Sequence, residues 1–365
     1  MTVNLQRIPI ELRTADGMLS FVDGCEDRET WVAVGMALKS EFGDDAFNIW
    51  HGWSQNAANY SAAACRSSWK GFKSHSAGGY TIGTLVKLAK DGGYTFDKTE
   101  APVVDQAELA RRRAERSARI AVEQADRAKL AHCAETSAMA LWRSGLRHGN
   151  SAYAKRKGLQ DPESCRYLSE EQGGGLLVPM LRYDLPRDQS LKGIQTIRED
   201  GVKRFTHGML KPGTACRLGL PVVGDPVFVC EGYATGMSLR MAMARRFAVY
   251  VAFDAYNLPL VVDAVYQANP QNPLVICADD DHATTIKGIA HNTGRIQAQI
   301  ALDGVMDGPK GAKLVVRTYP VFKKETPRGP KDTDFNDLHR LEGLAEVAAQ
   351  LELSLEIIQT LKTYG

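Results

Sequence analysis

Short apolar runs followed by polar turns recur through the second half of the chain. The runs at 227–230, 247–252 and 274–278 are apolar at every position, as strands buried on both faces are. Helical periodicity lies between and after them, at 234–245, 258–269, 284–302 and 341–361, and a fourth strand is predicted at 313–317. Strands that alternate with helices in this way predict a parallel α/β sheet.

Before residue 222 the pattern changes twice. Short β-branched runs separated by turns predict strands at 176–183, 193–197 and 202–205, while a stretch rich in Ala, Glu, Gln and Arg predicts one long exposed helix. The first part of the chain has helical periodicity and a glycine stop. We therefore predict a multidomain fold: an all-α domain at 1–95, a connector helix at 96–145, an α+β subdomain at 146–221, an α/β domain with a parallel sheet at 222–345, and a C-terminal helix at 346–365.

Composition excludes several classes of protein. Apolar residues make up 44% and charged residues 24% of the 365 positions, and the net charge is only +2, so any nucleic-acid contact must come from local patches. No apolar run could span a bilayer, and the first residues lack the apolar core of a signal peptide, which predicts a cytoplasmic protein without membrane contact. The seven cysteines form no C-x-x-C pair, and no P-loop motif occurs, so we expect neither a zinc module nor a P-loop ATPase.

Acidic residues follow two of the predicted strands directly. Glu231 comes after the first apolar run, Asp279 and Asp281 come after the third, and Asp334 lies further on. The carboxyl ends of parallel strands meet at one edge of a sheet, where ligands bind in open α/β folds. Carboxylates gathered there repel one another unless a cation neutralises them, and oxygen ligands suit Mg²⁺ or Mn²⁺. We expect these four residues to form a metal site for phosphoryl chemistry.

The spacing of these residues separates their roles. On an extended segment, the D-x-D spacing turns Asp279 and Asp281 to the same side, both able to face one cation, and turns Asp280 elsewhere. Gly232 is expected to permit a sharp backbone turn that lets Glu231 enter the site. Glu231 either binds the metal or manages a proton, and the spacing leaves both roles open.

Six basic residues lie along and between the short predicted strands of the α+β subdomain. They are Arg182, Arg198, Lys203, Arg204, Lys211 and Arg217. Period-two alternation would place several of them on one face of the sheet, where they would hold template or nucleotide phosphates beside the acidic site. The alternative is that they are solvated residues that protect strand edges from aggregation.

Four of the five tryptophans fall within residues 1–95. They are predicted to anchor the core of a small domain, and the alternative is that they stack on bases. Trp69 and Phe72 would share one helix face and pack inward together. This region resembles the helical accessory domain attached to primases of phages, plasmids and integrated elements, which implies a replication context. The segments that carry the resemblance are Ile49-Trp50, Trp53-Ser54, Tyr60, Trp69-Lys70-Gly71-Phe72-Lys73 and Gly79-Tyr80-Thr81-Ile82-Gly83-Thr84-Leu85.

The acidic pattern resembles that of the Toprim fold, which topoisomerases, bacterial-type primases and some nucleases share. The matching segments are Glu231-Gly232-Tyr233-Ala234-Thr235-Gly236 and Ala278-Asp279-Asp280-Asp281. Two more segments resemble those of phage and plasmid primases: Phe253-Asp254-Ala255-Tyr256-Asn257-Leu258 and Lys331-Asp332-Thr333-Asp334-Phe335-Asn336-Asp337-Leu338. The zinc-binding domain and the helicase often fused to such primases have no counterpart in these motifs.

The resemblance implies a DNA primase that makes short RNA primers on single-stranded DNA from ribonucleoside triphosphates, in the replication of a mobile genetic element. Glu231, Asp279 and Asp281 would be catalytic, and a separate replicative helicase would be a partner. Two alternatives stay open. A Toprim nuclease would use the same carboxylates, although such nucleases usually carry an ATPase domain. A non-catalytic replication or DNA-binding accessory protein would have kept only the binding surface.

Overall fold

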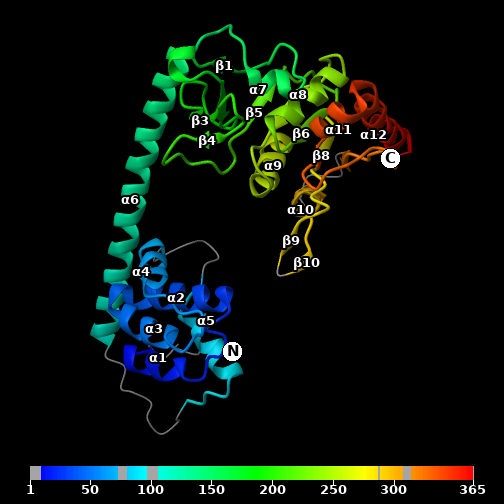
Figure 1. Ribbon diagram of the computed structural model, residues 1–365. Coiled ribbons are helices and arrows are strands. Elements are labelled where there is room, and N and C mark those ends of the chain that lie inside the picture. Colours follow the sequence, from blue (N-terminus) through cyan, green and yellow to red (C-terminus); the bar gives the residue numbers. More distant parts are fainter. Residues whose placement is uncertain (1–9, 73–79, 97–105, 287, 307–313, 365) are drawn as a thin grey trace. The chain divides into compact units, whose positions relative to one another are not determined.

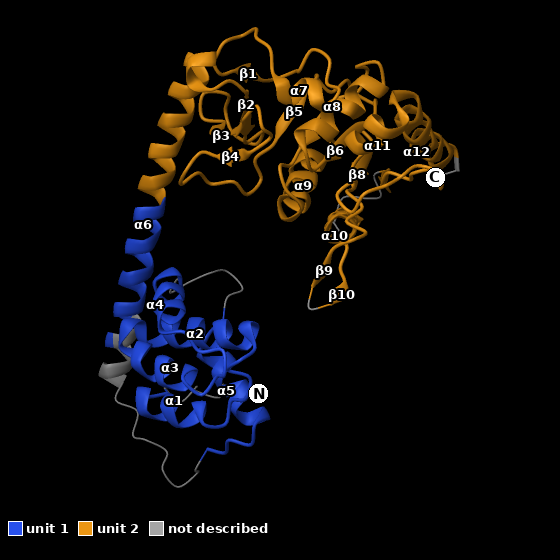
Figure 2. Cartoon of the chain, in the orientation of Figure 1, with its two compact units in different colours: residues 1–127 blue, residues 128–365 orange. Residues whose placement is uncertain are grey.

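The computed structural model describes residues 10–72, 80–96, 106–286, 288–306 and 314–364, and the motif residues Lys73 and Gly79 lie outside these ranges (Figure 1). The chain forms two compact units, 1–127 and 128–365 (Figure 2). A helical region comes first and an α/β region follows, so the predicted fold class is confirmed. Among the described residues, no helix is both long and apolar enough to cross a bilayer.

The first unit is built from short helices. They are α1 (Leu12–Leu19), α2 (Arg28–Phe42), α3 (Phe47–Ser54), α4 (Ala62–Gly71), α5 (Ile82–Asp91) and the beginning of α6 (Gln106–Ser144). Two of them begin at a side-chain cap: Asp27 accepts from the Thr30 N–H, and Ser61 accepts from the Ala64 N–H. Such caps satisfy backbone donors that a helix start leaves free.

Tryptophans form the centre of this unit. Trp50, Trp53 and Trp69 are buried, and each indole N–H donates a hydrogen bond within the chain. The rings of Trp69 and Phe72 both belong to this core, 6.0 Å apart between centroids. The prediction of core anchors is therefore confirmed for these residues, which have no free face for a base. Gly35 makes the packing possible, because a Cβ there would lie 2.4 Å from Phe72.

The second unit begins with the end of α6 and an antiparallel sheet. Its strands pair in the order β1 (Arg166–Tyr167), β2 (Leu176–Leu181), β3 (Leu191–Ile197) and β4 (Lys203–Phe205), with the short helix α7 (Ala152–Arg156) before them. Ala138 of α6 packs in one apolar cluster with Leu177 and Ile194 of this sheet. Lys192 and Glu135 add an ion pair of 2.8 Å between β3 and α6. The last turns of α6 are thus part of this core.

A five-stranded sheet follows, in the order β11-β8-β6-β7-β5. The strands β6 (Val227–Cys230), β7 (Val249–Val251), β8 (Leu274–Cys277) and β11 (Val315–Thr318) are parallel. At the edge, β5 (Cys216–Leu218) runs antiparallel to β7, so the predicted parallel sheet carries one additional antiparallel strand. An antiparallel edge on an otherwise parallel sheet is common. Its three residues were too short a run to be predicted as a strand.

Helices cover both faces of this sheet. Phe228 and Val275 face α8 (Tyr233–Ala242), α11 (Phe335–Glu342) and α12 (Leu344–Tyr364), and all five contribute to one apolar cluster. Val229 and Ile276 face the opposite way, with α9 (Leu258–Ala268) and α10 (Thr293–Met306). Both faces of the central strands are therefore buried, which explains why the runs that predicted them are apolar throughout.

Two predicted helices are wrong in their extent. The segment predicted as a helix at 284–302 begins as a hairpin of β9 (Thr285–Ile286) and β10 (Ile289–Ala290), and helix starts only at Thr293. Gly288 turns the hairpin with a φ of 77°, a region that glycine adopts without strain. The closing helix is likewise divided into α11 and α12 by Gly343, whose φ is 91°.

Candidate active site at the carboxyl ends of β6 and β8

Strand pairing brings the first two acidic positions side by side. β6 and β8 are neighbouring parallel strands, and Cys230 pairs with Cys277. Glu231 follows Cys230 directly, and Asp279 lies two residues beyond Cys277. Both carboxylates therefore emerge at the same edge of the sheet, where open α/β folds bind ligands.

The carboxylates at this edge repel one another. Burial and the charges of Asp281 and Asp254 raise the pKa of Glu231 to about 7. Burial, followed by the charges of Glu231 and Asp334, raises the pKa of Asp279 well above its ordinary value. These shifts mean that each site resists ionisation while its neighbours are charged. The pKa shifts therefore indicate that the nearby positive charge does not balance these carboxylates.

One carboxylate oxygen of this group lacks a hydrogen-bond partner. Oδ1 of Asp279 is buried and has no hydrogen-bond partner within the described part of the chain. Buried carboxylate oxygens are almost always paired, and a cation is one way to satisfy them. The donor set, which contains only oxygen, suits a hard divalent ion. Within the described residues, no three acidic, His or Cys side chains lie close enough together to hold an ion as they stand.

Asp281 and Asp280 of the D-x-D segment have different partners, as the spacing predicts. Oδ2 of Asp281 accepts a 2.8 Å hydrogen bond from the backbone N–H of Gly294, at the start of α10. Asp280 instead binds Arg295 at 2.7 Å and Arg328 at 3.0 Å. Burial opposes its ionisation, but hydrogen bonds from Asn292 and Arg328 and the charge of Arg295 lower the pKa of Asp280 overall. Asp280 therefore braces the loop as a permanent anion.

Asp334 also has a structural role. As the N-cap of α11 it accepts from the Asp337 N–H at 2.8 Å, and its second oxygen accepts from the Thr235 hydroxyl at 2.9 Å. Burial and the Asp337 charge raise the pKa of Asp334. These bonds join α11 to the start of α8, immediately after Glu231. Asp334 as a metal ligand stays a prediction.

The backbone beside Glu231 differs from the expected arrangement. Gly232 has a φ of −98°, which any residue can adopt, so the predicted need for a special turn is wrong. The constraint there is space, because a Cβ would lie 3.2 Å from the Thr235 hydroxyl. Strain lies instead at Phe253, whose φ of 73° is rare for a bulky residue and whose N–H donates to the Glu231 carbonyl at 2.7 Å. Phe253 begins one of the segments that resemble phage and plasmid primases, but no sequence pattern predicted its backbone conformation.

The six basic residues have different environments. Lys203 lies close enough to Glu231 for its charge to lower the pKa of that carboxyl. Arg204 follows it on exposed β4 and therefore points to the opposite face. The other four have partners inside the chain: Arg182 pairs with Asp184, Arg198 donates to the Gln172 carbonyl, Lys211 pairs with Asp254, and Arg217 lies over the Tyr183 ring. Of these six, Lys203 is the one whose charge acts on Glu231.

The sequence analysis missed a basic residue that does reach this group. Lys157 approaches Oδ1 of Asp337 to 3.4 Å, and its charge lowers the pKa of Asp334. Asn336 donates to the backbone carbonyl of Lys157 at 2.7 Å, which fixes the end of α7 against α11. No local pattern could have found this contact, because the partners are 180 residues apart.

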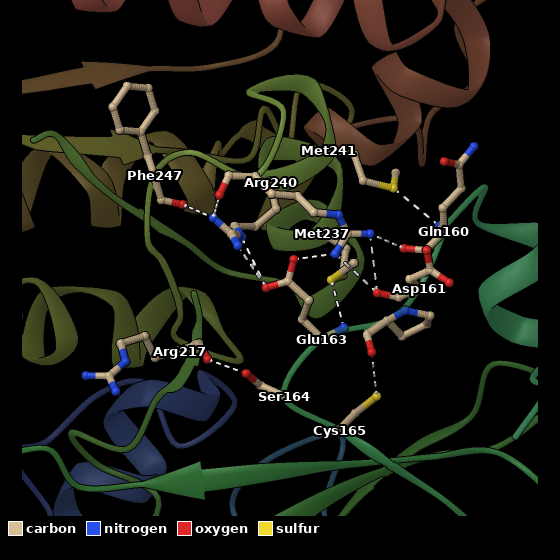
Figure 3. Close-up of polar contacts among 12 residues, drawn as sticks. Gln160, Asp161, Glu163, Ser164, Cys165, Arg217, Met237, Arg240, Met241 and Phe247 are labelled. Atoms are coloured by element: carbon tan, nitrogen blue, oxygen red, sulfur yellow. Dashed lines mark hydrogen bonds and ion pairs between the residues drawn. The ribbon is translucent and has the colours of Figure 1, made fainter. Parts of the chain in front are cut away.

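An ion-pair network fixes α8, the helix after Glu231 (Figure 3). Glu163 accepts from Nε of Arg240 at 3.2 Å and from its terminal nitrogen at 3.0 Å, and also pairs with Arg245. Arg240 further donates to the Phe247 carbonyl at 2.7 Å. At the first turn of α8, Tyr233 donates its hydroxyl to the Glu163 carbonyl at 2.6 Å. The segment before β1 thus holds both ends of the helix that positions Glu231.

Two family models match the chain. "Primase C terminal 2 (PriCT-2)" matches residues 17–89, within the helical unit. "Toprim domain" matches residues 226–345, which include Glu231, the D-x-D segment and Asp334. Residues 226–345 therefore match a Toprim domain, and the two matches together support a resemblance to Toprim primases of the phage and plasmid type. The predicted resemblance is confirmed for both regions.

The curated relatives of this chain are named as primases. A "DNA primase TraC" from Escherichia coli is 29% identical over 302 residues, which are 77% of this chain and 26% of the relative. A second protein of that name and organism is 29% identical over 184 residues, 49% of this chain and 12% of the relative. This chain thus spans about a quarter of the length of the first relative. The primase fragment of the bacteriophage T7 primase-helicase has a TM-score of 0.36 at 13% identity, covering 55% of this chain and 68% of the fragment, a likeness too weak to support an argument.

Proposed function

We propose that this chain synthesises short RNA primers on single-stranded DNA by divalent-metal-dependent nucleotidyl transfer, in the replication of a mobile genetic element. The observation that carries the proposal is the group of repelling carboxylates around the unpartnered Oδ1 of Asp279. The name of the curated relatives, DNA primase, supports it. Mg²⁺ or Mn²⁺ is the cation, because the available ligands are oxygens.

Different side chains of the site have different proposed roles. Asp279, Asp281 and Glu231 would hold the cation, with Asp334 as a further ligand or as the cap that fixes the loop. When bound there, a divalent cation would supply charge neutralisation for a nucleoside triphosphate and activation of a 3′-hydroxyl. The alternative role for Glu231 is proton transfer, because its pKa of about 7 in the metal-free chain allows it to take up or release a proton near neutral pH. Lys203 brings a positive charge to the same place.

We also propose the partners that follow from this activity. Ribonucleoside triphosphates and single-stranded DNA are the substrates, and exposed Arg204 is the residue of β4 best placed to meet template phosphates, since it points away from Lys203. The helical unit recruits a replication partner such as a separate helicase, because its tryptophans are used in its own core. We infer a cytoplasmic location, where these substrates are found.

One assay separates this function from its alternatives. The chain is incubated with single-stranded DNA, ribonucleotides and Mg²⁺ or Mn²⁺. New oligoribonucleotides support the proposal, and degraded template indicates a Toprim nuclease. If neither product forms, the remaining alternative is an accessory DNA-binding protein. Asp303→Asn, which neutralises an exposed aspartate of α10, is the matched control for Asp279→Asn. Primers that persist unchanged in Asp279→Asn would remove the carboxylates from the reaction.

A further inference from the structure

The hairpin between the D-x-D segment and α10 carries two exposed isoleucines. Ile286 on β9 and Ile289 on β10 are 49% and 73% exposed, and they are register partners. Partners in an antiparallel pair have their side chains on the same face, so the two form one apolar surface near the end of the hairpin. β9 and β10 form a separate two-stranded sheet, which Figure 1 shows as a projection from the second unit. Neither isoleucine belongs to the apolar clusters formed by the described residues.

Hydrogen bonds fix both ends of this hairpin to the acidic loop. At its start, the Thr284 N–H donates to the Asp281 carbonyl at 3.0 Å. At its end, Asn292 accepts from the Asp281 N–H at 3.0 Å and donates to Oδ1 of Asp280 at 2.7 Å. Ile286 follows Asp281 closely in the sequence, and the chain between them spans at most about 18 Å at full extension. The segment that carries the site carboxylates therefore also sets the position of the isoleucines.

The composition of the hairpin suits a nucleic-acid partner. Residues 282–291 contain one lysine, two histidines and no acidic residue. His282 is exposed, and alternation along the second strand places His291 on the face that carries Ile289. Basic residues attract an anionic partner, while the isoleucines need an apolar surface to cover them. Base edges bordered by phosphates offer both.

We propose that the hairpin packs Ile286 and Ile289 against the minor groove of the primer–template hybrid that forms at the carboxylates. The proposal rests on the proposed function and gives its product a contact outside the acidic site. An RNA–DNA hybrid has A-form geometry, with a wide, shallow minor groove that exposes base edges. At about 3.4 Å per base pair, the isoleucines lie no more than about five base pairs from Asp281, a distance that a short primer covers. The contact would hold a short hybrid in place while it is extended.

The chemistry of the hairpin favours a duplex over a single strand. Proteins that bind a single strand stack its bases on aromatic side chains and on Arg. Residues 282–291 contain no Phe, Tyr, Trp or Arg. Aliphatic side chains that project from a protein are instead typical of contacts in the minor groove of a duplex. The alternative is that Ile286 and Ile289 only stabilise the hairpin through their cross-strand contact.

Two double variants of the full chain test the contact without metal or catalysis. The valine pair is Ile286→Val, Ile289→Val, and the threonine pair is Ile286→Thr, Ile289→Thr; both keep β-branched side chains, and only the second is polar. The probe is a labelled RNA oligonucleotide annealed to a longer DNA strand, followed by anisotropy in chelator. We expect the threonine pair to bind it at least about fivefold more weakly than the valine pair, or about 1 kcal/mol. The control Val222→Thr, Val223→Thr changes residues that are 58% and 74% exposed and should bind as the unaltered chain does. Equal affinities of the valine and threonine pairs overturn the proposal.

Further measurements separate the possible failures. Both pairs should bind an oligo-dT strand equally, and a loss of single-strand binding as large as that of hybrid binding would make the hairpin a template contact, which overturns the assignment. Both pairs should also unfold at the same urea concentration, and a less stable threonine pair whose hybrid binding is unchanged would leave the isoleucines a structural role alone. If the threonine pair makes primers of unchanged length and binds the hybrid normally, the hairpin proposal fails while the primase stands. If the unaltered chain makes no primers but hybrid binding depends on the isoleucines, the primase fails and the hybrid contact stands.

Discussion

The backbone N–H of Gly294 donates a 2.8 Å hydrogen bond to Oδ2 of Asp281, so the start of α10 holds one of the site carboxylates. Gly294 also lies against the other end of the D-x-D segment, since a Cβ there would be 2.4 Å from the Asp279 carbonyl oxygen. Only a residue without a side chain can approach both carboxylate positions in this way. The first turn of α10 therefore helps to fix the conformation of the acidic loop.

Gly294→Ala should therefore impair primer synthesis more than stability. The added methyl group must push α10 away from the loop, at a cost of about 1–3 kcal/mol, and the bond to Asp281 is lost with it. We expect at least a tenfold fall in primer yield, measured beside urea unfolding. Gly304→Ala in the same helix is the control: a Cβ there meets nothing within 4 Å, and alanine is the better helix former by up to about 1 kcal/mol. Equal activities in the two variants would contradict this role of Gly294.

Neutralising Asp279 should abolish synthesis without destabilising the metal-free chain. Asp279→Asn removes one ionisable carboxyl from a group whose members raise one another's pKa, so repulsion stays level or falls. We expect a melting temperature in chelator that is unchanged or higher, with primer synthesis lost. Asp281→Asn should lose synthesis as well. Asp280→Asn offers a contrast, because it breaks pairs with Arg295 and Arg328 and should lower the melting temperature. Lower stability in Asp279→Asn would show that the carboxylate is satisfied in the metal-free state.

The stability of the metal-free chain should depend on pH through Glu231. Burial and the Asp281 charge raise its pKa to about 7 in the folded state, from an ordinary 4.5. Between these values the folded state holds a proton that the unfolded state has lost, so stability falls as pH rises through this window and then levels off. Unfolding free energy in chelator should fall between about pH 5 and about pH 8, and fall less in Glu231→Gln. Equal falls in both proteins would exclude Glu231 as the cause.

Removing Glu163 should destabilise the second unit strongly. Arg240 is buried, and without this carboxylate it keeps only carbonyl acceptors for its charge. Breaking a buried ion pair from one side costs about 3–5 kcal/mol, and the retained carbonyl bonds and partial exposure bring our expectation to about 2–4 kcal/mol. Urea unfolding of Glu163→Ala measures this. Glu352→Ala, at an exposed position of α12, is the control and should change stability by less than about 0.5 kcal/mol.

Local patterns predicted the parts of the fold that depend on local chemistry. β6 and β8 are buried on both faces, so their apolar runs were visible in the sequence, and parallel pairing then placed Glu231 near Asp279. The hairpin at 285–290 was not predicted, because a few β-branched residues beside a helix are compatible with either periodicity. β5 was missed because a three-residue edge strand has no period to detect.

The basic cavity of about 330 Å³ lined by Tyr153, Lys157, Lys203 and Arg340 could not be predicted for a different reason. Tyr153, Lys157 and Arg340 lie outside every recognisable motif, and only tertiary packing brings α7 beside α11. Of the six basic residues expected to bind phosphate, Lys203 alone lines this pocket, because its strand partner and turn determine which way it points. Many basic residues in one segment indicate that it can contribute to an anion site. The direction of each side chain is set by long-range contacts, which a local pattern does not show.

The boundary between the two units can be tested by truncation. A chain of residues 128–365 should fold, because it keeps Ala138 and Trp142 of α6 against the antiparallel sheet, together with the Glu135–Lys192 pair. A chain of 145–365 lacks these contacts, exposes Leu177 and should unfold at lower urea concentration. We expect the longer fragment to retain primer synthesis at high template concentration but to need more template for half-saturation, if the helical unit or its partner contributes to capture. Titration of template against the fragment and the full chain measures this. Identical half-saturation values would leave the helical unit with partner recruitment alone, and a stable 145–365 fragment would show that the end of α6 is dispensable for the second core.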